Sequence, residues 1–197
     1  MNTFYHVDTT SQLRAGMTID LSPDKASAFG LIYQRQFRGA GITAELELGR
    51  APPMPNLLRE PAYREYYLEL FRRHNPRISG LATVSRLNSF FAFRSTQDAK
   101  RYLERHSPKH PPKIYTIHCE GQHLGFDMTW LDQLFPRDIG AFSYYYESYW
   151  KGLLISGDEH LSGHEKRGSL IEVLITSPIT VGNEIYAPVN NDVNPIA

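Results

Sequence analysis

A stretch rich in β-branched residues near the C-terminal end constrains the fold more than any other feature of the chain. Residues 169–186 read SLIEVLITSPITVGNEIY. Such residues favour strands. Ser177 and Pro178 interrupt the run, because proline cannot donate to the hydrogen-bond ladder of a sheet. The stretch therefore predicts two strands that follow one another directly, with no helix between them.

The rest of the chain does not alternate regularly between strand and helix. Strands are predicted at 4–7, 17–21, 89–93 and 113–121. Helices are predicted from Ser22 onward, over 62–74, from Ser95 onward, and as two short segments within 128–150 split near Pro136. Because a doubly wound parallel sheet needs repeated βαβ units, this order disfavours one. We expect an α+β fold in a single domain, residues 1–197.

Charge and composition narrow the classes of partner and compartment. Lys plus Arg and Asp plus Glu number 21 each, so no overall field attracts nucleic acid or an anionic membrane. The single cysteine, Cys119, cannot form an internal disulfide. No stretch approaches the ~18 apolar residues of a membrane span, and the N-terminus lacks a signal-peptide pattern. We expect a soluble cytoplasmic protein, or an effector exported without a cleaved signal.

Three blocks place unusual residues on predicted strands. His6 lies in FYHV, and Glu172 lies in SLIEVLI, where it shares one strand face with two leucines. The third block is SRLNSFFAFRSTQDAKRY, residues 85–102. A carboxylate on a half-buried face must be paired, neutralised or catalytic. No GxGxxG or GxxxxGK[ST] accompanies these blocks, which argues against a Rossmann site and a P-loop.

The three blocks resemble, in order and rough spacing, motifs of the ADP-ribosyltransferase superfamily. FYHV followed by LRAGMTIDLSP resembles the first motif, most closely that of the rifampicin ADP-ribosyltransferases. FFAF and a capped helix that carries Ala99 and Tyr102 resemble the second motif, found also in poly(ADP-ribose) polymerases and diphtheria toxin. Glu172 on a late strand resembles the catalytic glutamate. The resemblance implies a split antiparallel β-sheet core with flanking helices.

The function implied by this resemblance is NAD-dependent ADP-ribosyl transfer. NAD is the co-substrate: its nicotinamide glycosidic bond is cleaved, and ADP-ribose passes to an acceptor. The resemblance implies that His6 binds a ribose hydroxyl, that Tyr102 stacks on nicotinamide, and that Glu172 stabilises the positive charge that grows on the sugar carbon. The cofactor-binding residues implied are His6, Tyr5, Thr9, Arg86, Asn88, Ser89, Phe90, Phe91 and Tyr102. No metal site is implied.

Departures from the family pattern leave other functions open. Phe90 stands where the second motif often has tyrosine, and Val7 and Asp8 follow His6 where glycine and threonine are usual. An NAD glycohydrolase with water as acceptor, and a catalytically inactive nucleotide- or partner-binding domain of the same fold, are the alternatives. Glu147 is the rival catalytic carboxylate.

The sequence does not indicate which acceptor receives ADP-ribose. A protein, a nucleic acid and a small molecule all remain open, as do the roles of toxin, effector and resistance enzyme. The segments RQFRG, LFRRHNPR and AKRYLERH would make a basic rim for nucleic acid if the fold gathered them.

Overall fold

The computed structural model describes residues 1–22, 24–39, 61–81, 83–106, 111–132, 139–166 and 168–186. Within these ranges the protein is a mixed α+β fold with one seven-stranded antiparallel sheet. The strands are β1 (Asn2–Asp8), β2 (Thr18–Ile19), β3 (Phe90–Phe93), β4 (Lys113–Cys119), β5 (His123–Asp127), β6 (Ile171–Ile175) and β7 (Ile179–Tyr186). The α-helices are α1 (Ala28–Gly39), α3 (Pro61–His74), α4 (Thr96–His106) and α5 (Ile139–Trp150). Short 3-10 helices are η2 (Arg86–Asn88), η3 (Met128–Leu131) and η4 (Ile155–Gly157).

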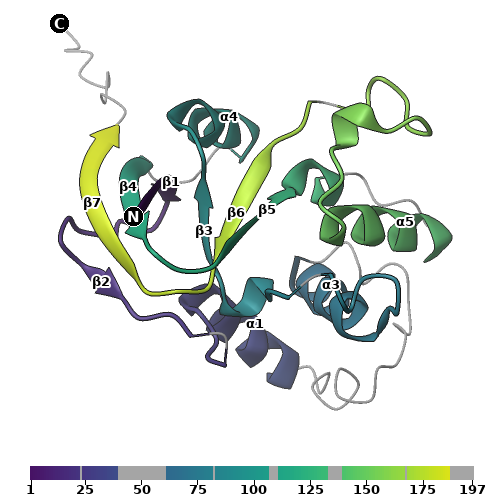
Figure 1. Ribbon diagram of the computed structural model, residues 1–197, viewed down its shortest axis with the longest axis horizontal. Coiled ribbons are helices and arrows are strands. Elements are labelled where there is room, and N and C mark those ends of the chain that lie inside the picture. The colour runs from purple at the N-terminus through teal and green to yellow at the C-terminus, as the bar shows by residue number, and fades with distance from the viewer. Residues whose placement is uncertain are drawn as a thin grey trace, which may run out of the picture.

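The sheet consists of two halves that meet at a weakly paired boundary. Its strand order is β2-β7-β4-β1-β3-β6-β5. β1 pairs with β4 along its whole length, from Asn2↔Cys119 to Asp8↔Lys113. Its register with β3 is the single pair Tyr5↔Phe93. Figure 1 shows β2, β7, β4 and β1 on the left and β3, β6 and β5 at the centre. We call the boundary between β1 and β3 the seam.

Two short links require the halves to fold toward each other. Residues 120–122 join β4 to β5, and residues 176–178 join β6 to β7. Each link connects strands four positions apart in the sheet order, which is ~19 Å in a flat sheet. A link of this length spans at most ~13 Å. The sheet is therefore strongly curved, and the two links lie together: Thr176 N donates to Gln122 O at 3.3 Å.

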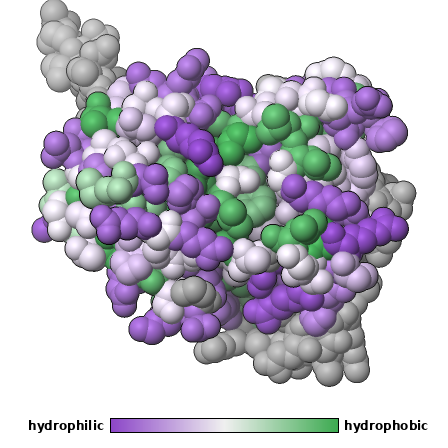
Figure 2. All heavy atoms as spheres, in the orientation of Figure 1, coloured by the Kyte–Doolittle hydropathy of each residue, from purple (hydrophilic) through white to green (hydrophobic). Residues whose placement is uncertain are grey.

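Separate clusters of buried side chains cover the two faces of the sheet. The inner cluster lies between the halves and comprises Phe4, Leu21, Ala92, Tyr115, Ile117, Cys119, Val173, Ile175, Ile179 and Val181. On the outer face of the second half, Leu174 and Phe126 pack with aromatic side chains of α3 and α5. These helices lie to the right of the sheet and below it in Figure 1. On the face seen in Figure 2, apolar residues run along the middle, between more polar regions.

Most predicted elements are present, with corrections at three places. α1 begins at Ala28 rather than near Ser22, because Ser27 Oγ accepts the hydrogen bond of Gly30 N at 3.2 Å and so caps the helix. β5 was not predicted, since HLGFD contains glycine and aspartate, which strands disfavour. The two late strands follow one another directly, as predicted, but they do not pair with each other: β6 pairs with β3 and β5, and β7 pairs with β2 and β4.

Two other expectations are confirmed. The predicted cap at the start of α4 is present, with Asp98 N donating to Ser95 Oγ at 3.0 Å. Leu170 and Leu174 are buried on the same side of β6 as Glu172, as the alternation predicted. Within the described ranges, no helix combines the length and apolar character needed to cross a bilayer.

Candidate functional site

The three sequence blocks lie on three neighbouring strands of the sheet. β1 carries His6, β3 carries the FFAF block, and β6 carries Glu172. The register aligns Tyr5 with Phe93 and Phe93 with Glu172 in one row. Residues paired in this way share a face of the sheet, and the next residue along a strand points to the other face. Tyr5 therefore shares the outer face with Glu172, and His6 does not.

The structure consequently does not bring His6 and Glu172 together. The residue two before His6 on its strand, Phe4, belongs to the inner cluster, as do Ala92 and Val173. The His6 ring lies 4.4 Å from the ring of Phe90, beside Ala92 on the inner face. The expectation that His6 and Glu172 act on the same sugar is corrected here. His6 is the next residue after Tyr5, which lies in the row of Glu172, and neighbouring residues of a strand point to opposite faces.

His6 stands at the seam with one ring nitrogen engaged. Its Nδ1 lies 2.6 Å from the carbonyl oxygen of Phe91. A carbonyl only accepts, so Nδ1 carries the proton and Nε2 presents a lone pair. Burial lowers the pKa of His6, against the opposing effects of Phe91 and nearby Asp8, so the ring is neutral at pH 7. No described residue hydrogen-bonds Nε2, and the side chain is only half-buried.

Asp8 follows His6 on the same side of β1. Its carboxylate accepts hydrogen bonds from Thr10 N and Thr10 Oγ1, both at 2.8 Å, and from Leu13 N at 2.9 Å. Burial by itself would raise the pKa of Asp8, but these hydrogen bonds outweigh it and lower the pKa. Asp8 is therefore an ionised residue that shapes the turn after β1. Thr9, predicted to bind cofactor, is half-buried in that turn.

Glu172 belongs to a buried network centred on Arg86. Arg86 Nη1 donates to Glu172 Oε1 and, at 2.8 Å, to the hydroxyl of Tyr149. That hydroxyl donates to the same Glu172 oxygen at 2.7 Å. Arg86 Nε donates to Glu65 Oε2 at 2.8 Å. The network ties η2, α5, β6 and α3 together, and Glu172 is only 3% exposed within it.

Aromatic rings surround the guanidinium of Arg86. Its Cζ lies 4.8 Å from the ring centroid of Phe91, 5.5 Å from that of Tyr149 and 6.0 Å from that of Phe29. Such contacts are favourable for a desolvated cation. Phe91 and Arg86, both predicted to bind cofactor, thus pack against each other inside the protein.

The charges of the Arg86 network are strongly coupled. Burial would lower the pKa of Arg86, but Glu172 and Glu65 outweigh it and hold the pKa well above its ordinary value. Burial would also raise the pKa of Glu65, but Arg86 and Arg64 lower it. For Glu172 burial dominates and raises the pKa, although Arg86 and Tyr149 oppose this. A carboxylate bound in this way is not placed to contact a substrate.

The other predicted site residues lie apart from His6 or are engaged in local structure. Ser89 is buried, and its hydroxyl donates to Ser85 O at 2.6 Å. Tyr102 lies 5.3 Å, ring to ring, from Phe93 and stacks on His106 at 4.2 Å. Asn88 is half-buried in η2, and Tyr5 is half-buried on the outer face. None of these contacts forms a shared site with His6.

The rival carboxylate, Glu147, lies on α5. It forms salt bridges with Lys151 at 2.5 Å and with the largely exposed Arg77 at 3.6 Å. These contacts place Glu147 in a surface charge cluster. Sequence reasoning missed the roles of Glu65 and Tyr149. Glu65 is one of several charged residues of α3, and Tyr149 is one of several tyrosines of α5, so nothing local indicated that both would meet Arg86.

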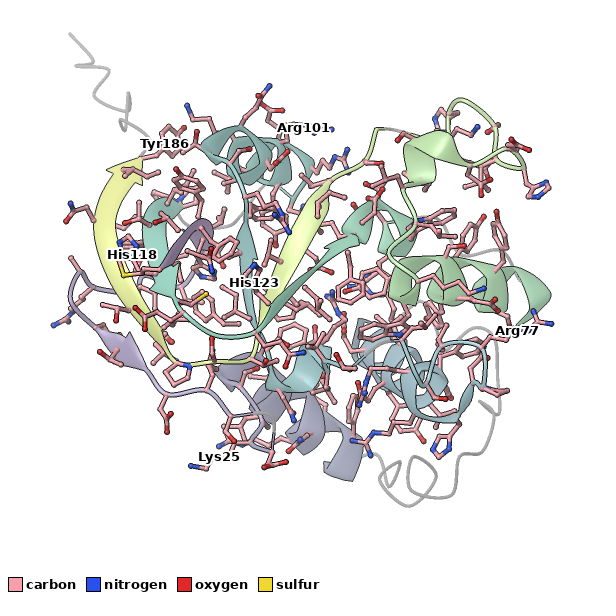
Figure 3. All side chains as sticks on the ribbon, in the orientation of Figure 1. Lys25, Arg77, Arg101, His118, His123 and Tyr186 are labelled. Carbon is pink, nitrogen blue, oxygen red and sulfur yellow. The ribbon has the colours of Figure 1, made fainter. Side chains whose placement is uncertain are left out.

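The basic segments do not form one rim. AKRYLERH lies in α4, while RQFRG ends α1, and LFRRHNPR spans the end of α3. Figure 1 shows α4 at the top of the molecule and α1 and α3 at the bottom. Figure 3 shows Arg101 of α4 at the top and Arg77 far away on the right. Among the side chains that the structure describes, no basic surface combines all three segments.

The sequence matches no model of a known protein family, and no curated protein matches it. In the part of the chain that the structure describes, no three or more His, Cys, Asp or Glu side chains are grouped to hold a metal ion.

Proposed function

We propose that the chain is a nucleotide-binding domain of ADP-ribosyltransferase-like architecture that binds NAD, through its ADP-ribose part, at the seam. The observation that carries this proposal is the position of His6. Sequence blocks from both ends of the chain stand on adjacent strands β1, β3 and β6, and the boundary between the first two has one residue pair. His6 stands at that boundary.

The chemistry of the seam suits a ribose. A neutral imidazole whose Nδ1 proton is held by Phe91 O offers Nε2 as an acceptor for a hydroxyl group. The half-buried ring of Phe90 lies beside it and provides an apolar face for a sugar or a base. This combination of one fixed polar atom and one aromatic surface is typical of small-molecule sites.

Binding without cleavage is the function that we favour over transfer and over hydrolysis. Cleavage of the glycosidic bond needs a carboxylate aimed at the sugar carbon where positive charge develops. Glu172 points to the outer face, and its Oε1 already accepts from Arg86 and Tyr149. Reaching a ligand beside His6 would require Glu172 to cross the sheet. We therefore propose that Glu172 serves the fold.

Calorimetry and a nicotinamide assay test this proposal together. NAD and ADP-ribose should bind the full chain, and chromatography should detect no released nicotinamide. His6→Ala should abolish binding. His118→Ala is the matched control, because His118 lies on the opposite side of the first half, with Nδ1 3.2 Å from Thr3 Oγ1; this variant should bind normally. Circular dichroism verifies that each variant is folded.

Two results would contradict the proposal. Absence of NAD and ADP-ribose binding would remove nucleotide recognition and leave a partner-binding module. Release of nicotinamide that Glu172→Gln abolishes would establish catalysis. In that case labelled NAD separates the two enzymes: label on an acceptor indicates transfer, and free ADP-ribose indicates hydrolysis.

A further inference from the structure

Asp8 adds a negative charge to the seam that the binding of a ribose does not require. It stands two residues after His6 on β1, so both side chains point to the same side. It is 2% exposed. Its three hydrogen bonds from Thr10 and Leu13 hold both carboxylate oxygens in place. The charge is thus fixed in position beside His6.

We propose that Asp8 is a specificity-determining residue that keeps anionic groups away from His6, so that this position takes an uncharged hydrogen-bond donor and rejects a phosphate. The inference rests on the proposed function, because it concerns the ligand bound at the same seam. It adds a role for Asp8 and the requirement that the group bound beside His6 is uncharged.

The hydrogen-bonding arrangement supports this selection. Nε2 of His6 presents a lone pair, and an ionised phosphate oxygen also presents lone pairs, so the two repel. Phosphates are normally held by Arg, Lys or backbone N–H groups. The sequence of β1, NTFYHVD, contains no Lys or Arg. A hydroxyl or an amide N–H can donate to Nε2 without facing a like charge.

The cation paired with Asp8 across the two strands is already engaged. Lys113 of β4 lies directly opposite Asp8. Its Nζ binds Glu184 Oε2 at 2.8 Å. The pair Lys113–Glu184 is neutral overall, so it does not cancel the charge of Asp8. The pairing across β4 therefore leaves the negative charge of Asp8 in place.

Nuclear magnetic resonance of the His6 ring tests the inference in the unmodified protein. NAD and inorganic phosphate serve as the two probes at pH 7.5. NAD should shift the His6 carbon and proton resonances, whereas phosphate at a concentration tenfold above that of NAD should leave them unchanged. In Asp8→Asn, phosphate should shift the resonances, and its affinity should be on the order of tenfold higher than in the wild type. A tenfold change in affinity corresponds to the same free energy as a shift of about one pKa unit. Asp20→Asn makes the same charge change away from the seam and should behave as wild type.

The outcomes separate the inference from the proposed function. If phosphate shifts His6 in the wild type as strongly as NAD does, the inference is wrong while nucleotide binding stands. NAD that binds in calorimetry without moving the His6 resonances would place the site elsewhere and overturn both the inference and the proposed function. If NAD does not bind at all, the proposed function fails first. If phosphate leaves the His6 resonances unchanged in Asp8→Asn as well, Asp8 does not set the selectivity and the inference is wrong. The variant retains an acceptor oxygen for Thr10, and thermal unfolding verifies that it folds. A wild type whose His6 resonances respond to phosphate overturns the inference even if the variant does not fold.

Discussion

Arg86 and Glu172 form an ion pair beneath the helices, although 86 residues separate them in the chain. The pair explains why a glutamate can stand between leucines on a buried strand face. Its partner is a guanidinium that also binds Glu65 and is enclosed by aromatic rings. The carboxylate predicted to be catalytic is, in this geometry, part of what holds α3, α5 and β6 together.

Removing the cation of the Arg86 network should strongly destabilise the fold. Arg86→Met leaves two buried carboxylates without their partner, and breaking a buried pair in this way costs about 3–5 kcal/mol. Chemical denaturation measures the loss. The triple variant Arg86→Met, Glu65→Gln, Glu172→Gln removes the unpaired charges and should recover part of it. A loss below about 1 kcal/mol in the single variant would contradict the role given to Arg86.

Adding one methyl group tests the contact between the two links, residues 120–122 and 176–178, that join the halves of the sheet. A β-carbon at Gly121 would lie 2.3 Å from Ser177 Cβ, too close for either residue to remain in place. Gly121→Ala should therefore cost about 1–3 kcal/mol in the free energy of unfolding. Combining it with Ser177→Gly should restore much of the loss. Gly163→Ala is the control, since a β-carbon there meets nothing within 4 Å; equal losses at both positions would refute the packing argument.

The pKa of His6 should lie below its ordinary value. Burial lowers its pKa from 6.5, so the unfolded chain takes up a proton at a higher pH than the folded chain does. Because the unfolded state then binds more protons, stability should fall as the pH drops below 6.5 through the folded pKa. Nuclear magnetic resonance titration of the ring measures the midpoint. A midpoint above 6.5 would contradict the half-buried, neutral imidazole.

His106 should show the opposite dependence on pH. Its Nε2 lies 3.7 Å from Asp132 Oδ1, and this carboxylate raises the pKa of His106 above 6.5. The stabilising contribution is complete below pH 6.5 and is lost as the pH rises through the folded pKa. Because the pair is partly exposed, it should contribute no more than about 0.5 kcal/mol. In denaturation, the stability difference between wild type and His106→Asn should be larger at pH 6 than at pH 9, because only the contribution of Asp132 depends on the charge of the ring.

Much of the local structure could be predicted from near neighbours in the sequence. Repeated β-branched residues marked β6 and β7, and Ser95 with Asp98 marked the start of α4, because hydrogen bonds and side-chain alternation between near neighbours decide such features. The sequence also singled out the strands of His6 and Glu172. It missed β5, whose residues favour a strand only once β6 lies beside them.

Which of these residues meet depends on strand register and on packing between elements that are distant in the chain. The face on which a side chain lies depends on register, and a shift of one residue reverses it. Tyr5 rather than His6 aligns through Phe93 with Glu172, and Arg86 reaches Glu172 because η2 packs against α3, which supplies Glu65. Register and packing join residues that are distant in the chain, so no local pattern in the sequence specifies them.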